Sequence, residues 1–159
     1  PSMDIQIPSN FERLLFEMCR RDGSKVKDSL AEFRKSGELK IPPSELTELQ
    51  KKWSSARIDD DQTLQTIAEI YKETGELIDP HTAIGIAAGK EKRSSGQIPL
   101  VCLGTAHPGK FPEAVIKATG RKPELPKQLQ DLYDRTEHYS VLPNDYGLVK
   151  SHIEKTVRG

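Results

Sequence analysis

The sequence predicts an α/β fold in which helices dominate and one parallel strand, at about residues 98–104, is buried on both faces. Three observations lead to this prediction. Apolar residues recur at helical spacing through most of the chain, with capping residues before the helices and glycines after them. The run "QIPLVCLG" is almost continuously apolar, which is typical of a strand inside a parallel sheet. The other extended pieces, "ELKIPP" and "HYSVLP", predict only short strands.

Four helices are expected in the first half of the chain, each with an apolar face. The capping residues expected at their starts are Ser9 or Asn10, Ser24, Ser44, and Asp60 or Asp61. Glycines are expected to end the first, second and fourth helices at Gly23, Gly37 and Gly75. The three consecutive aspartates at 59–61 lack the glycine and later glutamate of a calcium loop, so capping explains them better than metal binding.

A fifth helix is expected to begin at Asp79 and Pro80, because aspartate is a good N-cap and proline suits the first helical position. The predicted strand at 98–104 follows, then a short helix at about 111–118. A helix through Leu129 and Leu132 and a last helix from near Asn144 complete the chain. A single buried strand cannot pair its own backbone, so the remaining strands of its sheet are expected to lie outside this chain.

Length and composition restrict the possible classes. The 159 residues suit one domain, and 24 basic residues balance 24 acidic ones, which gives no field that attracts nucleic acid or anionic membranes. No apolar run could span a membrane. Cys19 and Cys102 lack metal or redox spacing and are expected to be buried thiols in a reducing, cytoplasmic setting. We expect one incomplete domain over 1–159, with a helical insertion at 24–58 and a helical extension at 121–159.

The first group of candidate functional residues follows the predicted strand, and open α/β sheets bind ligands at that end of their strands. The Thr105 hydroxyl could bond a ring nitrogen or a substrate oxygen, or it could cap the following turn. His107 could line a pocket or hydrogen-bond its own loop. Lys110 could pair with an anion or stay solvated, and its polar surroundings do not favour a Schiff-base role.

Two predicted helix starts offer further polar groups. His81 and Thr82 lie in the first turn after Asp79, where free N–H groups attract anions, although a capping Asp79 would compete for them. Ser9, Asn10 and Arg13 could together bind a phosphate or carboxylate, or form only a capped helix with an exposed arginine. The sequence has no catalytic triad order, phosphate-binding glycine loop, zinc spacing or paired catalytic carboxylates.

Three segments, "SMDIQIPSNFERLLFE", "DPHTAIG" and "GTAHPGKFPEAV", occur in this order and resemble the C-terminal part of threonine synthases and threonine-synthase-like proteins. These are pyridoxal-phosphate enzymes of the tryptophan-synthase-β fold type, also called fold type II. The resemblance extends over nearly the whole chain but only the last third or so of such an enzyme. It implies that the chain is the helix-rich C-terminal portion of that fold.

The resemblance also implies a function. The family eliminates phosphate from O-phosphohomoserine and then forms threonine, or releases 2-oxobutyrate in lyase-type members. It implies that Thr105 faces the pyridine nitrogen of pyridoxal phosphate. It places on the side of the phosphorylated amino-acid substrate the residues Ser9, Asn10, Arg13, His81, Thr82 and His107.

The family's Schiff-base lysine and its loop for the cofactor phosphate belong to an N-terminal region that has no counterpart in these residues. The chain alone is therefore expected neither to bind the cofactor nor to act as an enzyme without that region. The alternative is a stand-alone, non-catalytic fragment that binds a protein partner.

Overall fold

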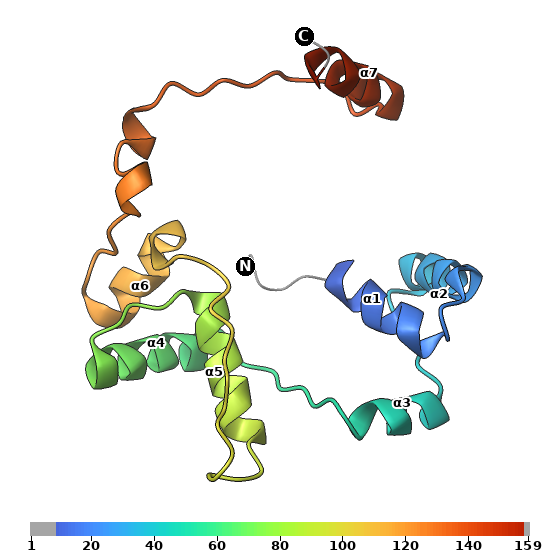
Figure 1. Cartoon of the computed structure of the whole chain (residues 1–159), viewed down its shortest axis with the longest axis horizontal. Helices are drawn as coiled ribbons and strands as arrows, with labels where there is room; N and C mark the ends of the chain where they lie inside the picture. Colours follow the sequence, from blue (N-terminus) through green and yellow to red (C-terminus); the bar gives the residue numbers. More distant parts are fainter. Residues whose placement is uncertain (1–8, 158–159) are drawn as a thin grey trace. The chain divides into compact units, whose positions relative to one another are not determined.

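A computed structural model describes residues 9–157, and every regular element in this range is a helix (Figure 1). The chain divides into two compact units, of which the first ends at Pro123 and the second begins at Glu124. The first unit contains α1 (Ser9–Met18), α2 (Gly23–Ser36), α3 (Pro43–Gln50), α4 (Asp60–Thr74), α5 (Pro80–Lys92), the 3-10 turn η1 (Pro108–Lys110) and α6 (Pro112–Thr119). The second contains the 3-10 turns η2 (Lys127–Leu129) and η3 (Leu132–Asp134) and the helix α7 (Tyr146–Val157).

Aspartates begin three of these helices. Asp22 accepts the backbone N–H of Ser24, and Asp59 forms a capping box with Gln62 at the start of α4. Ser24, Asp60 and Asp61, which were predicted as caps, therefore lie inside their helices, as does Ser44 in α3. Among the three helices that an aspartate caps, α5 is the one whose start, at Asp79 and Pro80, agrees with the prediction. Helices α2, α4 and α6 end at glycines with positive φ, Gly37, Gly75 and Gly120.

The core that matters for the site lies among α4, α5 and α6. Helix α4 packs against both α5 and α6, and each of the three contributes one fully buried apolar residue: Ile67, Ala83 and Val115. Thr63 and Thr66 of α4 are also buried, and their hydroxyls donate to the carbonyls of Asp59 and Gln62 one turn earlier. This small core fixes the first turn of α5, because Ala83 lies within it.

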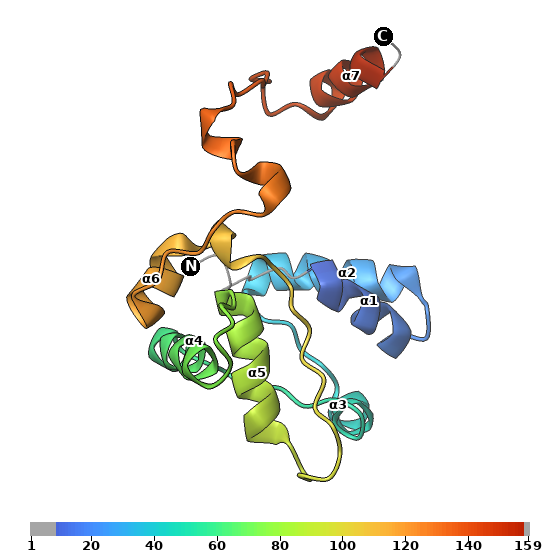
Figure 2. The ribbon, with the colours of Figure 1, turned by 60° about the vertical axis from the view of Figure 1, so that its left-hand side comes forward.

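The predicted strand at 98–104 is wrong, and with it the α/β assignment: residues 9–157 contain no strand or sheet. The segment is extended and runs beside α5 (Figures 1 and 2). A helix has already satisfied its own backbone, so it offers the segment no ladder of hydrogen bonds. "ELKIPP" and "HYSVLP", the expected short strands, also lack partners in the described range.

The segment's side chains alternate as a strand's do, although it is unpaired. Leu100 and Cys102 face α5: the Leu100 methyls lie against Gly89, and the Cys102 thiol lies 4.0 Å from the Gly85 carbonyl oxygen. The residues that follow each of these, Val101 and Leu103, are 81% and 76% exposed. The apolar segment therefore packs on α5 with one of its two faces, and its opposite face, which carries Val101 and Leu103, stays exposed.

Two further expectations differ in detail. The helix expected through Leu129 and Leu132 is replaced by the short turns η2 and η3. Cys19 and Cys102 are free thiols, and each is half-buried rather than buried. None of the helices within residues 9–157 has the length and apolar character needed to cross a membrane.

The role of the small core can be tested with a matched pair of substitutions. Val115→Ala should lower the free energy of unfolding by about 1–2 kcal/mol, because two buried methyl groups are lost while alanine's better helix propensity recovers part of the cost. Val101→Ala, at a position 81% exposed, should change it by less than about 0.5 kcal/mol. Urea unfolding followed by circular dichroism measures both, and equal effects would contradict the core described above.

The contact between the extended segment and α5 gives a second pair. Gly85→Ala has no atom within 4 Å of the new methyl group and should stabilise α5 by about 1 kcal/mol. Gly89→Ala gains the same helix propensity, but its methyl group would lie 3.1 Å from a Leu100 methyl carbon. We expect a smaller gain at Gly89 in thermal unfolding. A gain equal to that of Gly85→Ala would mean that Leu100 does not pack there.

Candidate functional site

The buried carboxylate of Asp79 organises the start of α5. Asp79 is 0% exposed, and its Oδ1 accepts from the backbone N–H of His81 at 2.9 Å and lies 3.0 Å from Nδ1 of the His81 ring. Its Oδ2 accepts from the Thr82 hydroxyl. One carboxylate thus caps the helix and also fixes two side chains of its first turn.

These hydrogen bonds also set the ionisation of Asp79. Burial by itself would raise the pKa of the carboxyl group, since it disfavours the charged form. The hydrogen bonds from Thr82 and His81 together outweigh burial, so the pKa lies below its usual value. Asp79 is therefore an ionised, fully buried acceptor at neutral pH.

Thr82 connects the first turn of α5 to the loop at 105–111 by a hydrogen bond. Thr82 is 8% exposed, and its hydroxyl oxygen accepts the backbone N–H of Thr105 at 3.2 Å, across 23 residues of sequence. The Thr105 residue itself is exposed, and within residues 9–157 its hydroxyl makes no hydrogen bond, so it does not cap the following turn. A fixed main chain with an available hydroxyl fits a partner such as a pyridine nitrogen, which needs one hydrogen-bonding group.

A second contact joins the same two elements. The half-buried ring of His81 packs on the Phe111 ring, with centroids 4.9 Å apart and a 56° angle between the planes. The exposed residue Lys110 also contacts the Phe111 ring, with its Nζ 5.5 Å from the ring centroid. Lys110 is thus solvated and its ammonium lies over an aromatic ring.

The two histidines present opposite hydrogen-bonding groups. The Asp79 carboxylate can only accept, so His81 Nδ1 carries the hydrogen and Nε2 is an acceptor in the neutral ring. The His107 ring uses Nδ1 to accept the backbone N–H of Gly109 at 3.1 Å, which leaves the hydrogen on Nε2. These tautomers are assigned from the partners of each ring. His81 therefore offers an acceptor, and His107 offers a donor.

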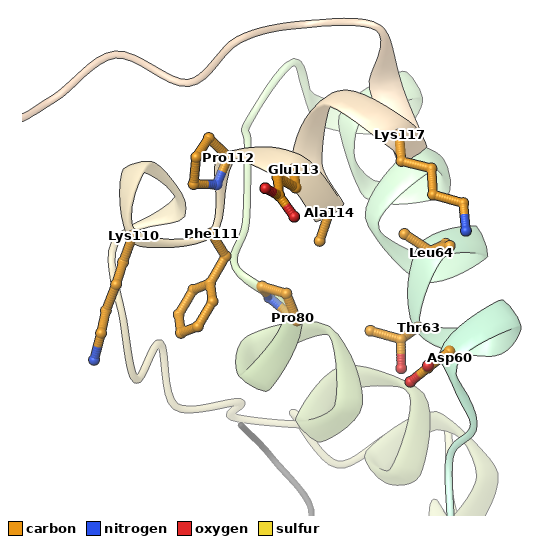
Figure 3. Close-up of a pocket in the computed structure, with 10 residues that line it drawn as sticks. All are labelled: Asp60, Thr63, Leu64, Pro80, Lys110, Phe111, Pro112, Glu113, Ala114 and Lys117. Atoms are coloured by element: carbon orange, nitrogen blue, oxygen red, sulfur yellow. The ribbon is translucent and has the colours of Figure 1, made fainter. Parts of the chain in front are cut away.

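A groove of about 570 Å³ lies between α4, α6 and the η1 loop (Figure 3). Figure 3 shows Lys110 and Phe111 at one end and Asp60 and Thr63 of α4 at the other. Its charged lining residues carry both signs: Asp60, Glu113, Lys110 and Lys117. Thr105, His81 and Thr82 do not line it, but Pro80 and Phe111 do, so the groove borders the network around Asp79.

The structure brings together only some of the residues predicted from the sequence. His81 and Thr82 join the loop that carries Thr105 and His107. Asn10 and Arg13 bond each other instead, with Arg13 Nη2 donating to Asn10 Oδ1 at 2.8 Å, and both are exposed. No hydrogen bond or ion pair among residues 9–157 links them to α5. The side chain of Ser9, the remaining candidate, lies outside the described part.

Sequence reasoning missed two residues of this site. Asp79 was predicted only as a cap, yet it also holds His81 and Thr82. The spacing Asp-x-His-Thr contained the signal, because N2 and N3 side chains lie near an N-cap. Phe111 was not considered, and its contact with His81 depends on tertiary packing that local sequence does not reveal.

Comparison with known proteins gives one consistent result. The family described as the C-terminal part of threonine synthase matches residues 82–153. Threonine synthase of Pseudomonas aeruginosa is 49% identical over 98% of this chain, which corresponds to 33% of that enzyme. The chain therefore spans about a third of the length of the relatives it matches.

Two solved structures are similar over essentially the whole chain. One is the pyridoxal-phosphate-bound threonine synthase of Brucella melitensis, with a TM-score of 0.80 and 43% identity over 100% of this chain and 34% of that one. The other is the yeast threonine synthase, with a TM-score of 0.76 and 30% identity over 99% of this chain and 36% of that one. The arrangement described above is thus similar to part of these enzymes.

The ionised Asp79 should stabilise the fold in a pH-dependent way. Its pKa is lower in the folded state than in the unfolded one, so its contribution is complete above the unfolded value of about 4 and disappears as pH falls through the folded value. Asp79→Asn should lower the free energy of unfolding at pH 7 by about 1–3 kcal/mol, since an amide cannot accept from all three donors. This deficit should shrink below about pH 4.

The control is Asp59→Asn, which alters the N-cap of α4 without touching this network. Asparagine caps as well as aspartate does, so only a few tenths of a kcal/mol should change. Urea unfolding at several pH values measures both variants. A deficit for Asp79→Asn that stays constant down to pH 3 would contradict the role of its charge.

Proposed function

Because the chain corresponds to the C-terminal part of threonine synthases, we propose that it carries one wall of a pyridoxal-phosphate site of threonine synthase type. The proposed reaction is elimination of phosphate from O-phosphohomoserine followed by formation of threonine. The chain acts in it together with an N-terminal part of about twice its length, as the one-third coverage of its relatives suggests. We assign the reaction to the cytoplasm, where its two free thiols would stay reduced.

The observation that carries this proposal is the state of Thr105. Its main chain is fixed by Thr82, while the residue is exposed and its hydroxyl makes no hydrogen bond within residues 9–157. In the proposed site this hydroxyl bonds the pyridine nitrogen of the cofactor. A hydroxyl, unlike a carboxylate, does not strongly favour a protonated ring nitrogen. When bound, pyridoxal phosphate supplies an electron sink for carbanions at the substrate's α-carbon.

The histidines suit the substrate side of the same wall. The Nε2–H of His107 is a donor for an anionic oxygen of the phosphorylated substrate, and Nε2 of His81 is an acceptor for its ammonium or hydroxyl groups. Thr82 contributes through Thr105, because its hydroxyl is already used by Asp79 and by the Thr105 N–H. Asn10 and Arg13 form a pair that could hold the substrate's phosphate or carboxylate.

The exposed apolar residues favour this proposal over a stand-alone binding fragment. Ile98, Val101 and Leu103 are 66%, 81% and 76% exposed along one short segment, which leads directly into Thr105. A self-sufficient domain rarely leaves so apolar a stretch open, whereas a chain that joins a larger partner does. The N-terminal part of the enzyme is the proposed partner.

The test uses a joined enzyme, in which this chain replaces the matching C-terminal part of the Pseudomonas aeruginosa threonine synthase. The joined enzyme should bind pyridoxal phosphate and release phosphate and threonine from O-phosphohomoserine, and the 159-residue chain alone should do neither. Thr105→Val should lower kcat/KM by about 10- to 100-fold, because one hydrogen bond to the cofactor is lost. Thr105→Ser should retain most of the activity.

Thr47→Val serves as the control. Its hydroxyl only bonds the Pro43 carbonyl on an exposed turn of α3, so activity should not change. Product analysis separates the two reaction types, since 2-oxobutyrate in place of threonine would identify a phospho-lyase. Full turnover by Thr105→Val would refute the role assigned to that hydroxyl.

A further inference from the structure

We propose that Asp79 is the positioning residue that holds the cofactor-facing loop, residues 105–111, on the first turn of α5 through Thr82 and His81. This inference rests on the proposed function for the role of Thr105, but the contacts that carry it are independent of any bound group. Asp79 itself would touch neither cofactor nor substrate. It acts through the two residues that its carboxylate fixes.

The first connection runs from Asp79 through Thr82 to Thr105. The Thr82 hydroxyl has one hydrogen, which it gives to Asp79 Oδ2. Its oxygen is then oriented to accept, and it accepts the N–H of Thr105. Without the carboxylate the hydroxyl could rotate and its acceptor lone pairs would no longer be aimed at the loop.

The second connection runs from Asp79 through His81 to Phe111. Asp79 Oδ1 fixes the His81 ring through Nδ1, and the other side of the contact is the Phe111 ring at 4.9 Å. Phe111 lies at the far end of the loop from Thr105, directly before α6. The two connections therefore hold both ends of the loop.

The loop needs these contacts because the segment before it has few contacts that could hold the loop in place. Residues 99–105 are extended without a strand partner in the described range, and Gly104 precedes Thr105. Beyond the Leu100 and Cys102 contacts, the backbone bond to Thr82 is what sets the direction of Thr105. A hydroxyl that must meet a single ring nitrogen tolerates little displacement.

Aspartate is the residue type that these contacts require. Its ionised carboxylate only accepts, and here it receives the His81 N–H, the His81 Nδ1–H and the Thr82 hydroxyl. Asparagine would cap the helix equally well but would turn a donating NH₂ group toward one of these donors. Asp79→Asn thus keeps the cap and removes the positioning.

The first measurement is hydrogen exchange by mass spectrometry on the joined enzyme without cofactor, in a peptide that contains Thr105. Thr82→Val should speed exchange at that amide by about fivefold or more, the factor that one hydrogen bond supplies. Asp79→Asn should act in the same direction, and Thr82→Ser should restore protection. The matched control is Thr66→Val, which also removes a buried hydroxyl, at 7% exposure, but from α4.

The second measurement is a double-mutant cycle on the affinity for pyridoxal phosphate, read from the absorbance of the bound cofactor. Thr82→Val and Thr105→Val should each weaken binding several-fold, and the double variant should be no weaker than Thr105→Val alone. Additive losses would overturn the proposed positioning, as would unchanged exchange at Thr105 in Thr82→Val.

The two proposals fail in different ways. If Thr105→Val binds cofactor normally, the assigned role of Thr105 is wrong and the positioning of a cofactor-facing group falls with it. The exchange measurement then still decides whether Asp79 and Thr82 hold the loop. If Thr82→Val exchanges normally while Thr105→Val loses activity, only the positioning role is refuted.

Discussion

The start of α5 and the loop at 105–111 are held together by contacts that depend on one buried charge. A carboxylate removed from water is costly unless donors replace its hydration, and Asp79 receives three from the first turn of its own helix. Because two of these donors are side chains, the same bonds that stabilise the charge also fix His81 and Thr82. The hydrogen bonds therefore run in one direction. The Thr105 N–H donates to the Thr82 hydroxyl oxygen, and the Thr82 hydroxyl donates to the Asp79 carboxylate, which can only accept.

A small apolar core gives this network a rigid base. Ala83 comes directly after Thr82 and is fully buried, together with Ile67 of α4 and Val115 of α6. The loop at 105–111 therefore joins two helices that pack on the same partner, α4: it is bonded to the start of α5 and leads into α6. The hydrogen bonds to Asp79 lie within the first helical turn of α5, and the bond from Thr105 to Thr82 connects that turn to the loop.

The sequence predicts what depends on local chemistry and fails where long-range pairing decides. The start of α5 was predictable because Asp79 and Pro80 encode a cap and a first turn by themselves. The strand at 98–104 was not, because an apolar run describes the surroundings a segment requires rather than a hydrogen-bonded partner that is present. Asp22, rather than Ser24, caps α2, because its carboxylate accepts the N–H groups of Ser24 and Lys25 and the helix therefore starts at Gly23. Phe111 joined the site through packing alone, which no local pattern reports.

The two histidines show why the role of a site residue cannot be assigned from its type. His81 and His107 are chemically identical, yet a carboxylate on Nδ1 makes His81 Nε2 an acceptor, and a backbone N–H on Nδ1 makes His107 Nε2 a donor. Each tautomer is set by a residue two positions away, Asp79 before the one and Gly109 after the other. The donor or acceptor role of each histidine is therefore decided by partners close in the sequence. The position of the loop at 105–111 relative to α5 is decided by Thr82 and Phe111, whose contacts connect residues distant in the chain.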